Sequence, residues 1–102
     1  MVAYRLTRDA QTDLIEIRRY TVKQWGLEQS KKYLLELRQT IKVLSETPEI
    51  GKQRHEVGNK VFSFPHVSHV IYYIINNKQL IVFGVLHKSM VPLLHLDDRN
   101  AT

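Results

Sequence analysis

The segment from His66 to His87, "HVSHVIYYIINNKQLIVFGVLH", decides the fold class that the sequence predicts. Two runs rich in β-branched and aromatic residues flank the pair Asn76-Asn77, which tolerates the positive φ angles of a tight hairpin turn. We therefore expect two antiparallel strands, at residues 66–75 and 79–87. Apolar side chains occupy both faces of these strands, which predicts a central hairpin covered at least partly on both sides.

Two further strands are predicted before this hairpin. At the N-terminus, Val2, Tyr4 and Leu6 alternate with their neighbours as in a strand with one buried face. The run "KVFSF" at residues 60–64 has the same β-branched and aromatic character as the hairpin. Residues 49–60 show little periodicity, and we expect an ordered loop there.

The sequence between the first strand and this loop predicts two amphipathic helices. The first begins after Thr7, an N-cap residue, runs to about Gln24 and stops at Gly26. The second follows at once and ends before Pro48. Their apolar stripes recur at three- and four-residue spacing and comprise Ala10, Leu14, Ile17, Thr21 and Trp25 in the first helix, and Ser30, Tyr33, Leu34, Leu37, Ile41 and Leu44 in the second.

The expected fold class is therefore α+β, with the element order β-α-α-β-β-β in a single domain at residues 1–102. A short break between the helices predicts an N-terminal helical hairpin. We expect this hairpin to pack on a small, twisted, mainly antiparallel sheet.

Composition limits the classes of function. The chain has 102 residues and a net charge of +5, which favours an acidic partner without specifying nucleic acid. It contains no cysteine, so disulfides and thiolate chemistry are excluded. We find no signal-peptide pattern and no apolar run long enough to span a bilayer, and we expect a cytoplasmic protein.

The histidines near the strand ends are candidates for metal binding or acid/base chemistry. On one strand, the spacing of His66 and His69 would direct their side chains to opposite faces, which argues against a shared metal. A two-residue loop at Asn76-Asn77 would place His66 opposite His87, whereas a four-residue loop would place Ser68 there. The register is open, and polar residues at the rim of a sheet are the alternative to a catalytic pair.

Basic residues form a second candidate constellation. Lys52, Arg54, Lys60 and Lys88 come from the predicted loop and the strand ends, where they could bind phosphates or carboxylates. A solvated surface is the alternative. The chain has no glycine-rich phosphate loop and no glycine elbow around a serine, which argues against nucleotide and hydrolase chemistry.

Five motifs in order resemble the ParE branch of the RelE/ParE toxin superfamily. They are "LTxxAxxDLxEI" at residues 6–17, "YTxxxWGxxQSxxY" at 20–33, "PxIGKxRxE" at 48–56, "SHVIYY" at 68–73 and "VLHKSM" at 85–90. The resemblance covers nearly the whole chain. It implies a bacterial, plasmid-stabilising type of toxin that inhibits DNA gyrase and is neutralised by a ParD-like antitoxin.

The resemblance also implies where the partners bind. The toxicity surface would comprise Arg54, His87, Lys88, Met90, Pro92, His95 and Arg99. The acidic segment of the antitoxin would bind along a groove bordered by Tyr20, Trp25, Tyr33 and Leu37, with core positions as the alternative for these four. The resemblance implies no cofactor, no metal, no membrane and no sequence-specific nucleic-acid binding, and two toxin chains could pair within the antitoxin complex.

Two alternatives accompany this interpretation. RelE-like relatives cleave ribosome-bound mRNA, and Arg54, His87 and Lys88 would be the catalytic candidates for that activity. The region "SFPHVSHV" lacks the usual arginine, however, and "SMVPLLHL" contains no tyrosine. The other alternative is a degenerate, non-toxic binding module.

We also expect a truncation after Lys88 to leave the fold largely intact, because the tail follows the last predicted strand.

Overall fold

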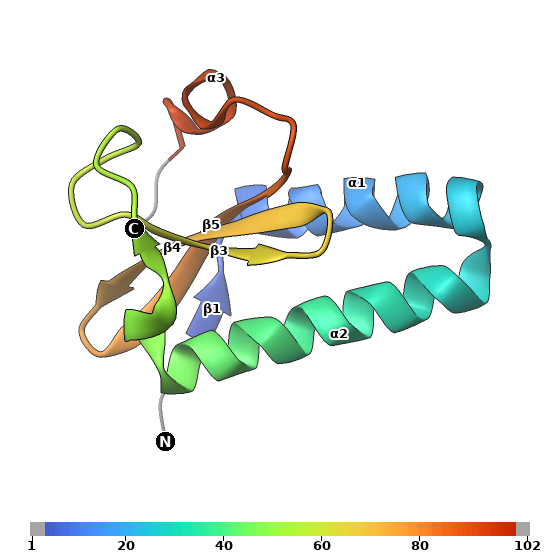
Figure 1. The fold of residues 1–102 in the computed structure, drawn as a ribbon, viewed down its shortest axis with the longest axis horizontal. Helices are drawn as coiled ribbons and strands as arrows, with labels where there is room; N and C mark the ends of the chain where they lie inside the picture. Colours follow the sequence, from blue (N-terminus) through green and yellow to red (C-terminus); the bar gives the residue numbers. More distant parts are fainter. Residues whose placement is uncertain (1–3, 100–102) are drawn as a thin grey trace.

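The computed structural model describes residues 4–99, and Figure 1 shows a helical hairpin lying along one side of a small twisted sheet. Val2 and Ala3 of the predicted first strand lie outside the described residues. The observed elements, in chain order, are β1 (Tyr4–Leu6), α1 (Arg8–Trp25), α2 (Leu27–Glu46), the 3-10 turn η1 (Pro48–Ile50), β2 (Lys52–Gln53), β3 (Phe62–His66), β4 (His69–Asn76), β5 (Gln79–His87) and α3 (Pro92–Leu96). The predicted α+β class and β-α-α-β-β-β order are confirmed, with β2 and α3 as additions.

The sheet has the strand order β1-β5-β4-β3-β2. The pair β1 and β5 is parallel, and the other neighbours are antiparallel. β1 ends where Leu6 pairs with Val82, although β5 continues to His87. The second half of β5 therefore has no strand neighbour on its outer side.

Helices α1 and α2 bury one face of the sheet. The Thr7 hydroxyl accepts a hydrogen bond from the Ala10 N–H (3.2 Å), and Gly26 ends α1 with a φ of 89°. Both predicted helix boundaries are thus confirmed. The core between hairpin and sheet comprises Ala10, Leu14, Ile17, Tyr33, Leu37, Ile41, Leu44, Ile71, Tyr73, Leu80, Val82 and Val85.

The opposite face of the sheet is covered by α3 and by the loop before β3. Leu96 of α3 is only 3% exposed and packs with Tyr72, Phe83 and Leu86. Gly84 lies directly beneath it, because a Cβ built there would be 2.6 Å from Leu96 Cδ2. The expected covering of both faces is confirmed. No helix within residues 4–99 is long and apolar enough to cross a bilayer.

The predicted registers at the strand ends are wrong. His66 ends β3 and His69 begins β4, with Val67 and Ser68 in the turn between them. The β4–β5 turn is centred on Asn77-Lys78, both with positive φ, one residue later than expected.

A β-bulge between Tyr72 and Tyr73 shifts the pairing of β4 with β5 by one further residue. His69 therefore pairs with His87, in place of either predicted partner, His66 or Ser68. The pattern of apolar residues could not reveal the bulge, since both faces of the hairpin are apolar.

Candidate functional site

A groove of about 540 Å³ follows the open half of β5. Ile17 and Tyr20 of α1 form one wall. Met90 and His95 form the other, and they belong to the segment Met90 to Arg99 after β5, called the tail below. His87 lies at the end of the strand that forms its floor. The groove therefore brings together several residues predicted for the two binding surfaces.

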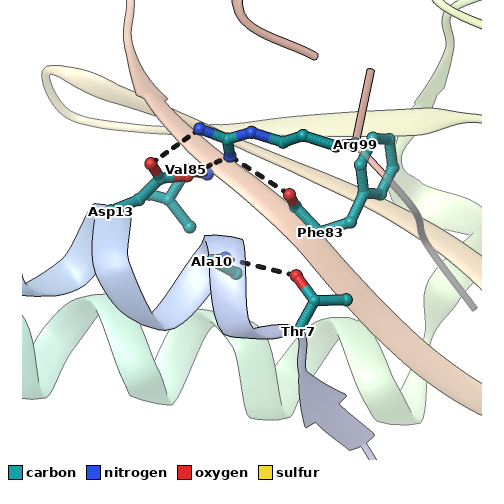
Figure 2. A network of polar contacts seen from close by, with 6 residues as sticks. All are labelled: Thr7, Ala10, Asp13, Phe83, Val85 and Arg99. Carbon is teal, nitrogen blue, oxygen red and sulfur yellow. Dashed lines mark hydrogen bonds and ion pairs between the residues drawn. The ribbon is translucent and has the colours of Figure 1, made fainter. Parts of the chain in front are cut away.

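The carboxylate of Asp13 lies at the open edge of β5 and accepts a hydrogen bond from its backbone (Figure 2). The Val85 N–H donates to Asp13 Oδ2 (2.9 Å), so a helix side chain replaces the missing strand. The Arg99 guanidinium binds the same carboxylate through Nη1–Oδ2 (2.5 Å) and Nη2–Oδ1 (3.0 Å). Nη1 also donates to the Phe83 carbonyl oxygen (3.2 Å).

This network connects the tail to the body of the protein. The side chains of Arg99 and Asp13 are 16% and 13% exposed, so the pair is largely shielded from water. The hydrogen bonds that Arg99 donates to Asp13 raise the pKa of Arg99, whereas burial acts in the opposite direction. Arg99 was predicted to lie on the toxicity surface. Its donors are directed inward, to Asp13 and to the Phe83 carbonyl oxygen, and its part in toxicity stays a prediction.

His87 faces the helical hairpin together with His69. Their rings lie edge to face with centroids 5.5 Å apart. The Ser89 N–H donates to His87 Nδ1 (3.1 Å), so the neutral ring carries its proton on Nε2. Burial lowers the pKa of His69 to about 4, with smaller contributions from His87 and His66.

His66 and His69 do not point to opposite faces, as one shared strand would have required. The two residues pair across the β3–β4 turn, so their side chains share a face, and both rings contact Tyr33. The structure nevertheless forms no group of three or more histidine, cysteine, aspartate or glutamate residues suited to a metal ion anywhere in residues 4–99.

Arg54 lies on the other face of the sheet. Its Nε donates to Glu56 Oε2 (2.8 Å) and its Nη1 to Ser63 Oγ (3.1 Å). The guanidinium also stands 5.5 Å from the centre of the Tyr72 ring, on the side covered by α3. Lys88 is exposed just after β5. Lys52, in β2, and Lys60, in the loop between β2 and β3, are exposed as well. Arg54 of the predicted basic constellation is therefore engaged by neighbouring side chains, whereas its three lysines are exposed.

The four residues predicted to border an antitoxin groove fall into two groups. Tyr20 and Trp25 are 57% and 46% exposed, at the end of α1 near the hairpin bend. Tyr33 and Leu37 are buried in the core between α2 and the sheet, so they offer no surface in this chain. For these two residues the core alternative is correct.

The tail also carries an apolar surface that extends beyond the predicted residues Met90 and Pro92. Val91, Leu93 and Leu94 are exposed, and Met90 and Pro92 lie beside them. Asp13 was missed as a functional candidate. The available signal was its place three residues after Ala10 and four before Ile17, on the buried side of α1, where a carboxylate requires a partner.

Two solved structures share this fold. A chain of the chromosomal ParDE toxin–antitoxin system from P. aeruginosa superposes with a TM-score of 0.75, over 85% of this chain and 96% of that chain, at 19% identity. A chain of the toxin–antitoxin complex RelBE2 from Mycobacterium tuberculosis gives a TM-score of 0.60, over 85% and 98%, at 20% identity. The chain thus shares the fold of these two chains.

Sequence comparison defines the family. Residues 4–92 match the family described as the ParE toxin of the type II toxin–antitoxin system parDE. Toxin ParE1 of Caulobacter vibrioides is 35% identical over 96 residues, which cover 94% of this chain and 99% of the relative. Toxin ParE of Escherichia coli is 30% identical over 100 residues, 97% of each chain. The chain belongs to the ParE toxin family of type II toxin–antitoxin systems, as the five motifs predicted.

Proposed function

We propose that this toxin acts as a protein inhibitor of DNA gyrase and that a ParD-like antitoxin neutralises it. Membership of the ParE family supports the toxin role and the type of antitoxin. The observation that favours inhibition by binding over RNA cleavage is the separation of Arg54 from His87. The two residues lie on opposite faces of the sheet.

Cleavage of an RNA phosphodiester requires an acid/base group and several cations around one phosphate. Here Arg54 is engaged by Glu56 and Ser63, and Arg99 is engaged by Asp13. Loss of one preorganised charge-stabilising donor costs about 3 kcal/mol of transition-state stabilisation. Lys88 and His87 alone do not supply the acid/base group and the several cations that cleavage requires. We therefore infer that the toxin does not cleave mRNA.

Protein binding has different requirements, which the tail meets. Exposed apolar side chains next to scattered charges are typical of protein–protein contact surfaces. We propose that Met90, Pro92 and His95, with the exposed leucines of α3, contact gyrase. His87 and Lys88 would flank this surface, while Arg54 would support the face on which α3 rests.

The antitoxin would bind the helical side of the molecule. Tyr20 and Trp25 supply exposed aromatic anchors there, and the net charge of +5 attracts an acidic segment. The solved relatives with this fold are toxin–antitoxin assemblies, which supports a protein partner of this kind. Pairing of two toxin chains within the complex stays a prediction.

Expression in bacteria tests the proposal. Induction of the chain alone should stop growth and accumulate gyrase-linked DNA breaks, and coexpression of the antitoxin encoded beside it should restore growth. Normal growth on expression of folded, unneutralised chain would favour the non-toxic binding module. Growth arrest without DNA breaks, accompanied by mRNA cleaved within ribosomes, would favour the nuclease.

A further inference from the structure

The Asp13–Arg99 pair joins three segments that are far apart in the sequence. Asp13 belongs to α1, its backbone partner Val85 belongs to β5, and Arg99 follows α3 (Figure 2). The Arg99 guanidinium also donates to the Phe83 carbonyl oxygen. One side chain therefore satisfies both the helix carboxylate and a backbone carbonyl of β5.

The tail has an inner and an outer side. On the inner side, Leu96 packs on Gly84 and Arg99 binds Asp13. On the outer side, Leu94 is 79% exposed and Leu93 is also exposed. Because α3 has only five residues, its own hydrogen bonds cannot hold it in place. The contacts of its inner side therefore set the direction in which the two outer leucines point.

We propose that Asp13 and Arg99 are positioning residues for the toxic surface. They hold α3 on the sheet so that Leu93 and Leu94 are presented outward, and neither contacts the target itself. The gyrase part of this inference rests on the proposed function, whereas the position of the tail can be measured without gyrase.

The variant Asp13→Asn distinguishes positioning from direct contact. It retains an oxygen that can accept from the Val85 N–H, but it removes the charge that binds Arg99. If Arg99 acted by binding the target, Asp13→Asn would free its guanidinium and preserve or strengthen inhibition. If Arg99 positions the tail, the same variant should weaken inhibition.

The experiment compares Asp13→Asn, Arg99→Gln and Arg99→Lys with a matched control, Arg19→Gln. Arg19 lies on α1 in an exposed ion pair with Glu16, so this control makes the same charge change as Arg99→Gln without touching the network. Amide hydrogen exchange of residues 91–99 reports the position of the tail. The amides of α2 report whether the fold is intact, and gyrase supercoiling reports function.

We expect exchange of the tail amides to accelerate roughly tenfold or more in Asp13→Asn and Arg99→Gln, with the concentration for half-inhibition rising by a similar factor. Arg99→Lys should lie between these variants and the wild type, because lysine keeps the charge but loses the two-pronged contact. Arg19→Gln should match the wild type in both measurements.

Two results would overturn the inference. The first is unchanged exchange of the tail in Arg99→Gln, and the second is full inhibition by Asp13→Asn despite a released tail. If wild-type toxin leaves gyrase active, the proposed function fails together with the gyrase part of this inference. Accelerated exchange in the variants would still identify Asp13 and Arg99 as the residues that hold the tail.

Discussion

The Tyr33 hydroxyl lies 2.7 Å from His69 Nδ1 and thereby joins the middle of α2 to the first residue of β4. The Ser68 N–H donates to the same hydroxyl (3.3 Å). Tyr33 and His69 are buried, and His69 also contacts His87 at the end of the neighbouring strand. A single phenol thus orders the strand ends that bound the groove.

We predict that Tyr33→Phe lowers the free energy of unfolding by about 1–3 kcal/mol, because it leaves His69 and the Ser68 N–H without a partner in a buried site. Urea denaturation of the purified chain measures this value. Tyr20→Phe is the matched control, since Tyr20 is exposed, and it should change stability by less than about 0.5 kcal/mol. Equal stability of both variants would show that the hydroxyl of Tyr33 does not hold the strand ends.

The stability of the protein should fall between pH 7 and pH 5. Burial lowers the pKa of His69 in the folded state to about 4, below the ordinary value of 6.5 in the unfolded chain. The unfolded state therefore binds more protons in this range, and the stabilisation present above pH 6.5 is lost as the pH falls. One such histidine contributes a loss of about 2 kcal/mol from pH 7 to pH 5.

Urea midpoints measured across this pH range test the assignment to His69. The variant His69→Gln should flatten the profile even if it is less stable overall. His95→Gln, which removes an exposed histidine, serves as the control. A slope that is the same in His69→Gln and in the wild type would contradict the assignment.

The fold was largely predictable because its determinants are local. Thr7 and Gly26 mark helix ends through their own backbone chemistry, and the apolar stripe from Ser30 to Leu44 identifies the buried face of α2. Trp25 departs from its stripe because α1 ends there, and its ring packs edge to face on Tyr33 while remaining half exposed. The register failed because the turn lies at Asn77-Lys78, one residue later than expected, and because the β-bulge at Tyr72 and Tyr73 has no sequence signature.

The site was less predictable because it depends on contacts between distant segments. The sequence from Met90 to Arg99 gives no sign of contacts with the rest of the protein. In the structure, Leu96 is buried and Arg99 pairs with Asp13, 86 positions earlier. These contacts argue against the expectation that truncation after Lys88 leaves the fold largely intact. Such a truncation would expose Phe83 and Leu86 and leave Asp13 without its cation.

Leu96 and Leu94 should separate stability from toxicity within one short helix. Leu96→Ala should lower stability by about 2–4 kcal/mol, because its side chain fills the core beneath α3. Leu94→Ala should change stability by less than about 0.5 kcal/mol but weaken gyrase inhibition. Thermal unfolding and supercoiling assays on both variants make the comparison. Undiminished inhibition by Leu94→Ala would exclude the outer side of α3 from the contact surface.

The exposed aromatics at the end of α1 should matter for the antitoxin. We expect Tyr20→Ala and Trp25→Ala each to weaken antitoxin binding by about tenfold, the size of effect found for aromatic anchors in protein interfaces. Tyr4→Ala, at the far edge strand of the sheet, serves as the control. Titration calorimetry measures the affinities, and a loss confined to Tyr4→Ala would place the antitoxin elsewhere.

The central claim is that this ParE-family toxin acts by binding gyrase and not by cutting RNA. The most direct measurement assays one preparation of purified chain for gyrase supercoiling and for cleavage of mRNA on translating ribosomes. We predict that supercoiling stops and the mRNA stays intact. Cleavage of ribosome-bound mRNA that disappears in His87→Ala, together with fully active gyrase, would contradict the claim.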